Sequence, residues 1–147
     1  MCSSDLEIAY WTGVAWQGLN DAAKAAECWN QAAGAGASEG TQSYYQALCL
    51  WKLGQNDRAK ALFQALVDTG RKMLQQPASG GGQQTPRARL ANAHYLAGLG
   101  YLGLDEREKA RAELSEAVET SPDLLGARAT LAGIAGFRPE YSLSTKN

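Results

Sequence analysis

The chain has no excess of charge of either sign and no long apolar run. Lysine and arginine contribute 14 residues against 15 aspartates and glutamates, so the formal net charge at pH 7 is -1. Without a basic surplus, we expect no binding to nucleic acid or to anionic lipid. No stretch approaches the ~18 consecutive apolar residues that a membrane-spanning helix needs, so we expect no membrane contact.

Histidine and cysteine are also scarce. The single histidine, His94, excludes a metal site built from several histidines. The three cysteines (Cys2, Cys28 and Cys49) are odd in number and contain no close pair, so neither a disulfide framework nor a zinc site is expected. Cys28 and Cys49 fall in helical stretches and are interpreted as small buried hydrophobic side chains.

The amino terminus lacks a basic region followed by an apolar segment, so it does not resemble a secretion signal. Helical periodicity starts directly after the stretch MCSSDL. We interpret residues 1–5 as a non-native or disordered leader, which would make the chain the C-terminal piece of a longer protein. The expected compartment is the cytoplasm, an expectation that a truncated amino terminus would weaken.

The chain does contain a recurring pattern of small and bulky side chains. Over Ala91–Leu124 the pattern consists of Gly98, Tyr101, Ala110, Leu114, Ala117 and Pro122. Two antiparallel helices approach closely only where one lacks bulk, and a large side chain of the other fills the gap. The spacing resembles that of the tetratricopeptide repeat (TPR), a helix–turn–helix of about 34 residues.

The same frame recurs twice upstream. One copy consists of Ala47, Leu50, Ala59, Phe63 and Leu66. The other consists of Gly13, Trp16, Ala25, Trp29 and Ala32. The first two copies are one repeat length apart, whereas the third follows after one and a half, because the uncharged stretch Gln75–Thr85 intervenes. Such a glycine- and glutamine-rich stretch is expected to be a mobile surface loop between two hairpins.

The resemblance implies an all-α fold: a right-handed α-solenoid of three TPR hairpins followed by a C-terminal capping helix. The predicted parts are the leader at 1–5, TPR 1 at 6–39, TPR 2 at 40–76, a flexible loop at 77–85, TPR 3 at 86–121, the capping helix at 122–137 and a tail at 138–147. Two local signals refine this outline. Asn20 is the expected N-cap of the second helix of TPR 1, and Ser121-Pro122-Asp123 is expected to open the capping helix at Pro122.

Motifs associated with catalysis have plainer explanations. Gly98–Gly103 (GLGYLG) fits the letters of a dinucleotide-binding loop, but it follows no strand and lies within an expected helix. Glu113, Glu116 and Glu119 recur every three residues and indicate a solvated helix face. His94 is interpreted as a satisfied or partly buried side chain. We therefore expect no enzyme activity, no cofactor and no metal.

In tetratricopeptide stacks the first helix of each repeat lines a concave groove, and by this resemblance we expect such a groove to bind a partner. The candidate contact residues are Tyr10, Tyr44, Leu48, Trp51, Tyr95 and Leu99. One tyrosine stands at the same position of each repeat, and tyrosine suits recognition because it offers area and a polar tip at low entropic cost. Alternatively, these tyrosines fill space between helices or contact a domain absent from the chain. Only Glu7 and Lys52 bring charge to the groove, which favours an apolar or amphipathic protein segment.

The expected function is a non-catalytic scaffold for protein–protein interaction. A second resemblance supports an alternative. The segments YYQALCLWKLG and HYLAGLGYLGL, with a broken connection between them, resemble the helical tail of large bacterial proteins of unknown function with a carbohydrate-active region. The chain would then be an accessory module that docks the catalytic region or a glycan. Self-association through an uncovered first helix, or docking onto another domain of the same protein, is a further expectation.

Overall fold

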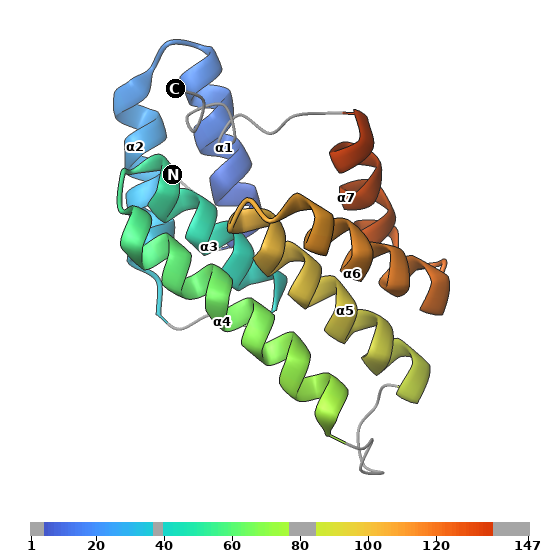
Figure 1. Cartoon of the computed structure of the whole chain (residues 1–147). Helices are drawn as coiled ribbons and strands as arrows, with labels where there is room; N and C mark the ends of the chain where they lie inside the picture. The colour runs from blue at the N-terminus through green and yellow to red at the C-terminus, as the bar shows by residue number, and fades with distance from the viewer. Residues whose placement is uncertain (1–4, 37–39, 77–84, 137–147) are drawn as a thin grey trace. The chain divides into compact units, whose positions relative to one another are not determined.

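Seven helices and no strand make up the part of the chain that the computed structural model describes, residues 5–36, 40–76 and 85–136 (Figure 1). The helices are α1 (Leu6–Gly18), α2 (Ala22–Ala33), α3 (Thr41–Lys52), α4 (Asn56–Gln75), α5 (Pro86–Gly103), α6 (Arg107–Thr120) and α7 (Leu125–Gly136). The predicted all-α class of TPR-like helical hairpins is confirmed.

The chain divides into two compact units, Met1–Leu66 (unit one) and Val67–Asn147 (unit two). Helix α4 contributes its first half to unit one and its second half to unit two. The predicted leader apart from Asp5, the predicted loop at 77–85 apart from Thr85, and the predicted tail at 138–147 lie outside the described residues. The predicted repeat boundaries stay a prediction.

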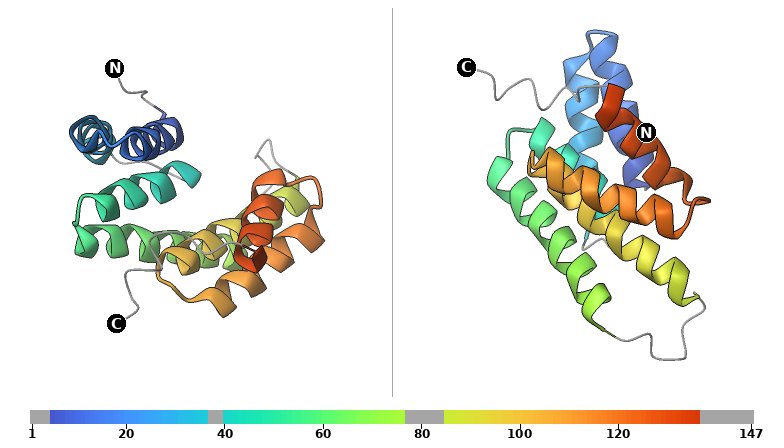
Figure 2. Two further views of the ribbon diagram at one scale, coloured as in Figure 1. Left: turned by 90° about the horizontal axis from the view of Figure 1, so that it is seen from above. Right: turned by 45° about the vertical axis from the view of Figure 1, so that its right-hand side comes forward.

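In unit one, α1 and α2 form a hairpin whose closest approach is made at a glycine. A Cβ atom at Gly13 would overlap the indole ring of Trp29, so only glycine leaves room for that ring. The indole Nε1 donates a hydrogen bond to the carbonyl oxygen of Tyr10 at 3.2 Å. Both views of Figure 2 show the two helices side by side, and α3 packs against both of them. The predicted fit of a small residue against a bulky one therefore closes this hairpin.

The turns between paired helices share one backbone conformation, which corrects a local prediction. Asn20 is not the N-cap of α2, because its φ of 63° places it in the left-handed region. Asp21 caps α2 instead, accepting a hydrogen bond from the Lys24 amide at 3.1 Å. Gly54 (φ 83°) and Asp105 (φ 62°) adopt the left-handed conformation at the corresponding turns. Glycine, asparagine and aspartate tolerate this region better than other residues do, so each ends one helix and lets the chain reverse.

Unit two repeats the arrangement at other glycines. A Cβ atom at Gly98 in α5 would lie 2.7 Å from Cγ of Leu114 in α6, and Leu114 is fully buried. A Cβ atom at Gly70, in the second half of α4, would lie 2.9 Å from Cβ of Ala97 in α5. Small residues on facing surfaces thus let α5 pack closely against both α4 and α6.

Helix α7 begins at Leu125 and not at Pro122 as predicted. Ser121 has an extended backbone at the end of α6 (φ -141°, ψ 92°), and its carbonyl oxygen accepts a hydrogen bond from the Leu124 amide at 3.1 Å. The serine–proline–aspartate sequence therefore forms a turn before the helix. Helix α7 then packs on α6, where its Ala127 is fully buried.

The close approach of α5 and α6 gives a test of the nesting principle. We expect Gly98→Ala to lower the free energy of unfolding by about 1–3 kcal/mol, because the added methyl group must displace the buried Leu114 side chain. The same change at Gly133 in α7, where a Cβ atom meets nothing within 4 Å, should raise stability by about 0.5–1 kcal/mol through helix propensity. Urea denaturation followed by circular dichroism compares the two variants. Equal stability changes would contradict the packing described.

Candidate partner-binding surface

A continuous line of aromatic rings runs across unit one. Ring-centroid distances join Trp11 to Tyr10 (5.0 Å), Tyr10 to Tyr45 (6.0 Å), Tyr45 to Tyr44 (5.3 Å) and Tyr44 to Phe63 (5.9 Å). These distances fall in the range of about 4.5–7 Å at which aromatic pairs stabilise each other by about 0.5–1.5 kcal/mol. We call these five residues the aromatic line. It connects α1, α3 and α4 within unit one.

Only part of the aromatic line faces solvent. Trp11 is 53% exposed and Tyr45 is half-buried, whereas Tyr10 and Tyr44 are each 7% exposed. The structure thus brings the predicted Tyr10 and Tyr44 together through Tyr45, with Trp11 and Tyr45 more exposed than the two predicted rings. The predicted contact residues do not include Trp11 and Tyr45, although each directly follows a predicted tyrosine at corresponding positions of two repeats. This repeated pair of neighbouring aromatic residues was the feature of the sequence that could have added both to the candidates.

The remaining predicted residues of unit one have different surroundings. Leu48 is 4% exposed, and Trp51 is half-buried. Lys52, which was expected to bring charge to the groove, has its Nζ 3.4 Å from Oε1 of Gln17 and 5.6 Å from the ring centroid of Trp29. This cation is therefore partly engaged within unit one.

Unit two holds the other two predicted contact residues, Tyr95 and Leu99. Leu99 is 2% exposed. Tyr95 is half-buried against α7, where a Cβ atom at Gly126 would lie 2.6 Å from the tyrosine Oη. A partner that contacted this ring would compete with α7. Partner contact by Tyr95 and Leu99, as by the four predicted residues of unit one, remains a prediction.

His94 is held by a carboxylate. Its Nδ1 lies 2.7 Å from Oε2 of Glu113, and the two side chains are 17% and 27% exposed. The prediction of a satisfied, partly buried histidine is confirmed. The predicted solvated face is wrong for Glu113, which meets α5, although Glu116 and Glu119 on the same helix are exposed. The pair connects α5 to α6 and acts as a structural link.

The glycine motif Gly98–Gly103 lies inside α5. Its backbone amides belong to the hydrogen-bond ladder of the helix, so they do not form a cradle for a pyrophosphate. Within residues 5–36, 40–76 and 85–136, no three His, Cys, Asp or Glu side chains are grouped so as to hold a metal ion. In the same part of the chain, no helix combines the length and apolar character needed to cross a membrane.

The cysteines differ in their chemistry. Cys28 and Cys49 are both buried, as predicted, with 2% and 0% exposure. Cys49 is a free thiol, and burial raises its pKa to about 12. Since the thiolate is the reactive form, Cys49 is a poor nucleophile at neutral pH. The interpretation of Cys28 as a simple buried hydrophobic side chain is wrong in one respect, because Cys28 is disulfide-bonded. Spacing along a sequence does not set the distance between thiols in the fold.

Comparison with known proteins supports one repeat directly. A family model described as tetratricopeptide repeat matches residues 43–69, which cover most of α3 and much of α4. A search of the curated proteins gave no match, and a search of the solved structures gave none. The chain therefore contains a TPR-type repeat in the region where TPR 2 was predicted.

The link between His94 and Glu113 predicts a difference between neighbouring glutamates. We expect Glu113→Ala to destabilise the chain by about 1 kcal/mol at neutral pH, because a partly buried histidine loses its hydrogen-bond partner. Glu116→Ala removes the same group from an exposed position of α6 and should change stability by less than about 0.5 kcal/mol. Thermal unfolding of both variants measures the difference. A cost at Glu116 equal to that at Glu113 would show that the contact contributes nothing.

The burial of Cys49 predicts slow alkylation. In the native chain we expect iodoacetamide to label Cys49 only as fast as unfolding exposes it, and denaturing urea should accelerate the labelling by orders of magnitude. Mass spectrometry of tryptic peptides locates the label. Rapid native labelling of Cys49 at pH 7 would be incompatible with its burial.

Proposed function

We propose that this chain is a non-catalytic scaffold that binds an apolar or amphipathic segment of another protein along the aromatic line of unit one. The TPR-type repeat supports the general role, because such helical hairpins are typical protein-interaction modules. The observation that carries the proposal is the half-exposed Trp11, which continues a line of rings fixed by the core.

The exposed edge of the aromatic line has the properties of a binding hot spot. Tryptophan and tyrosine supply large contact areas at low entropic cost and dominate many interfaces. Tyr10 and Tyr44, each 7% exposed, lie in ring contact with Tyr45, so the edge is preorganised. Preorganisation favours affinity because little side-chain entropy is lost on binding.

Helix α1 is apolar on two opposite faces. One face, which includes Leu6 and Gly13, is buried in unit one. The other carries Ile8, Thr12 and Ala15, and Ile8 is 54% exposed. The Thr12 hydroxyl donates to the carbonyl oxygen of Ile8 at 2.7 Å, which satisfies its polar group within the helix. A helix with apolar side chains on two opposite faces is normally covered on both of them.

The corresponding face of α3 is covered by a helix, because α2 packs against α3. Gln46 and Cys49 hold the positions equivalent to Thr12 and Ala15, and they are only 6% and 0% exposed. The Gln46 Nε2 donates to the carbonyl oxygen of Ala35, after the end of α2, at 3.0 Å. By this equivalence, we infer that a helix of the partner with an uncharged apolar face covers α1.

The test is a binding screen with designed peptides. Synthetic amphipathic helices with a leucine- and alanine-rich face are titrated against the purified chain, with fluorescence anisotropy as the readout. Replacing both Trp11 and Tyr45 with alanine should lower the affinity for the tightest-binding peptide at least about tenfold, as expected for a hot spot. Leu19→Ala is the control, since Leu19 is 71% exposed but lies outside the aromatic line. Unchanged affinity in the double variant, with unchanged helicity, would count against the proposal.

Light scattering on the same preparations identifies the source of the helix that covers α1. A concentration-dependent dimer that Ile8→Glu abolishes would mean that a second copy provides it. A monomer that binds the peptides would mean that another protein provides it.

The alternative of an accessory module for a carbohydrate-active protein is favoured by one observation. An indole that is 53% exposed, such as that of Trp11, offers a flat apolar face on which a sugar ring can stack. An oligosaccharide panel in the same screen separates the two proposals. Binding to glycans and not to peptides would favour the module.

A further inference from the structure

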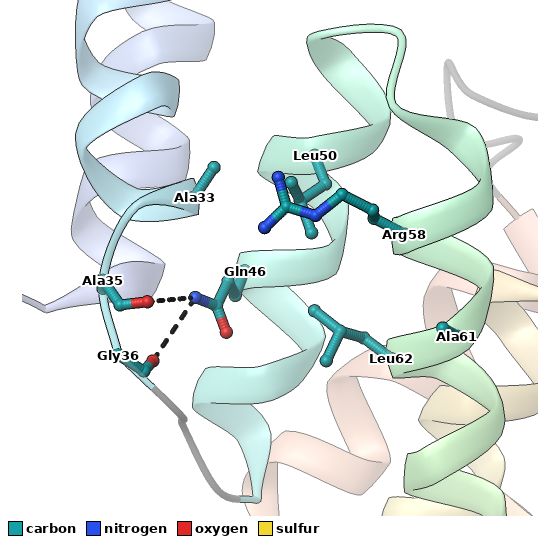
Figure 3. A pocket seen from close by; sticks show the side chains of 8 residues that line it. All are labelled: Ala33, Ala35, Gly36, Gln46, Leu50, Arg58, Ala61 and Leu62. Atoms are coloured by element: carbon teal, nitrogen blue, oxygen red, sulfur yellow. Dashed lines mark hydrogen bonds between the residues drawn. The ribbon is translucent and has the colours of Figure 1, made fainter.

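Unit one contains a cavity of about 380 Å³, open to solvent, between the end of α2, the middle of α3 and the first half of α4. Its apolar lining includes Ala33, Leu50, Ala61 and Leu62. Figure 3 shows the side chains of Leu62 and Arg58 extending from α4 toward α3. The volume falls within the range of about 300–1,000 Å³ typical of small-molecule sites.

Gln46 of α3 holds one side of the cavity in place. This side chain is 6% exposed, and its Nε2 donates to the carbonyl oxygens of Ala35 at 3.0 Å and Ala32 at 3.4 Å. The last carbonyl groups of a helix carry partial negative charge and lack partners within the helix. The Gln46 amide donates hydrogen bonds to carbonyl oxygens at the end of α2. These oxygens therefore repel an anion in the cavity less than free carbonyl oxygens would.

Arg58 is the only charged side chain among the described residues that line the cavity. Its Nη1 donates to Oε1 of Gln55 at 2.6 Å, which fixes one edge of the guanidinium group. Within the described part of the chain, no carboxylate forms an ion pair with Arg58. Among the described residues, a positive charge without an acidic partner therefore stands beside the cavity.

We propose that this cavity binds a small monocarboxylate with an apolar body of about four to six carbon atoms, a size suited to a small apolar pocket. The carboxylate accepts hydrogen bonds from the guanidinium group of Arg58, whose planar fork matches a carboxylate. The apolar body packs against Leu50 and Leu62. A doubly charged phosphate fits less well, because one guanidinium leaves part of its charge unpaired next to apolar walls.

The site is separate from the aromatic line, since none of the residues that line it belongs to that line. The proposal therefore does not depend on the scaffold function. The variant that lacks Trp11 and Tyr45 could lose peptide binding without any effect on ligand binding in the cavity.

The experiment measures binding of isocaproate to the full chain by NMR chemical-shift titration at millimolar concentrations. We expect saturable shifts for residues around the cavity in the wild type. Arg58→Gln should weaken binding at least about fivefold, as expected for an exposed charge-assisted contact. Lys60→Gln removes the same charge from an exposed position of α4 outside the cavity and should leave the affinity unchanged. Ala61→Phe, which fills the cavity, should abolish binding while the melting temperature stays close to that of the wild type.

Two further ligands identify the source of the carboxylate. Isocaproamide, which has the same body without charge, should not bind. A peptide that ends in leucine with a free carboxylate, compared with its amide, shows whether a protein C-terminus can supply the same chemistry. Absence of saturable isocaproate binding to the wild type would overturn the proposal. Affinity that neither Arg58→Gln nor Ala61→Phe changes would also overturn it.

Discussion

The structure depends on the close approach of paired helices at positions where one helix carries no side chain. Gly13 admits the indole ring of Trp29 in unit one, and Gly98 admits Leu114 in unit two. Without that approach, the Trp29 Nε1 would not reach the carbonyl oxygen of Tyr10. The position of α1, and with it the aromatic line, follows from this contact. Packing of this kind tolerates little added volume, because protein interiors are as dense as organic crystals.

Much of the fold could be predicted from the sequence, because the close approach of helices requires small residues at a regular spacing. Gly13, Ala47 and Gly98 recur in the same frame, and all three are buried in the structure. The local predictions that were wrong concern features that depend on the backbone conformation of single residues. Asn20 and Asp21 are both good N-cap residues, and composition does not reveal which of them adopts the left-handed conformation. Similarly, a Ser–Pro pair suits either a helix start or a turn.

The candidate surface was predictable only to within one helix position. Adjacent residues of a helix point about 100° apart, so Tyr10 faces the core while its neighbour Trp11 is half exposed. Which of two neighbours is covered depends on elements distant in the sequence. Tyr95 shows this dependence, because α7 packs over a ring that was expected to face a partner. Glu113 shows it as well, since its contact with His94 comes from another helix.

Nuclear Overhauser spectroscopy of the native chain tests the nesting of small residues against large ones most directly. We predict strong cross-peaks between the Gly13 Hα protons and the Trp29 indole protons. We also predict an upfield ring-current shift of those Hα resonances, and cross-peaks between the Gly98 Hα protons and the Leu114 methyl groups. Absence of these cross-peaks, with Gly13 Hα at random-coil shifts in a folded chain, would contradict the close approach of the helices.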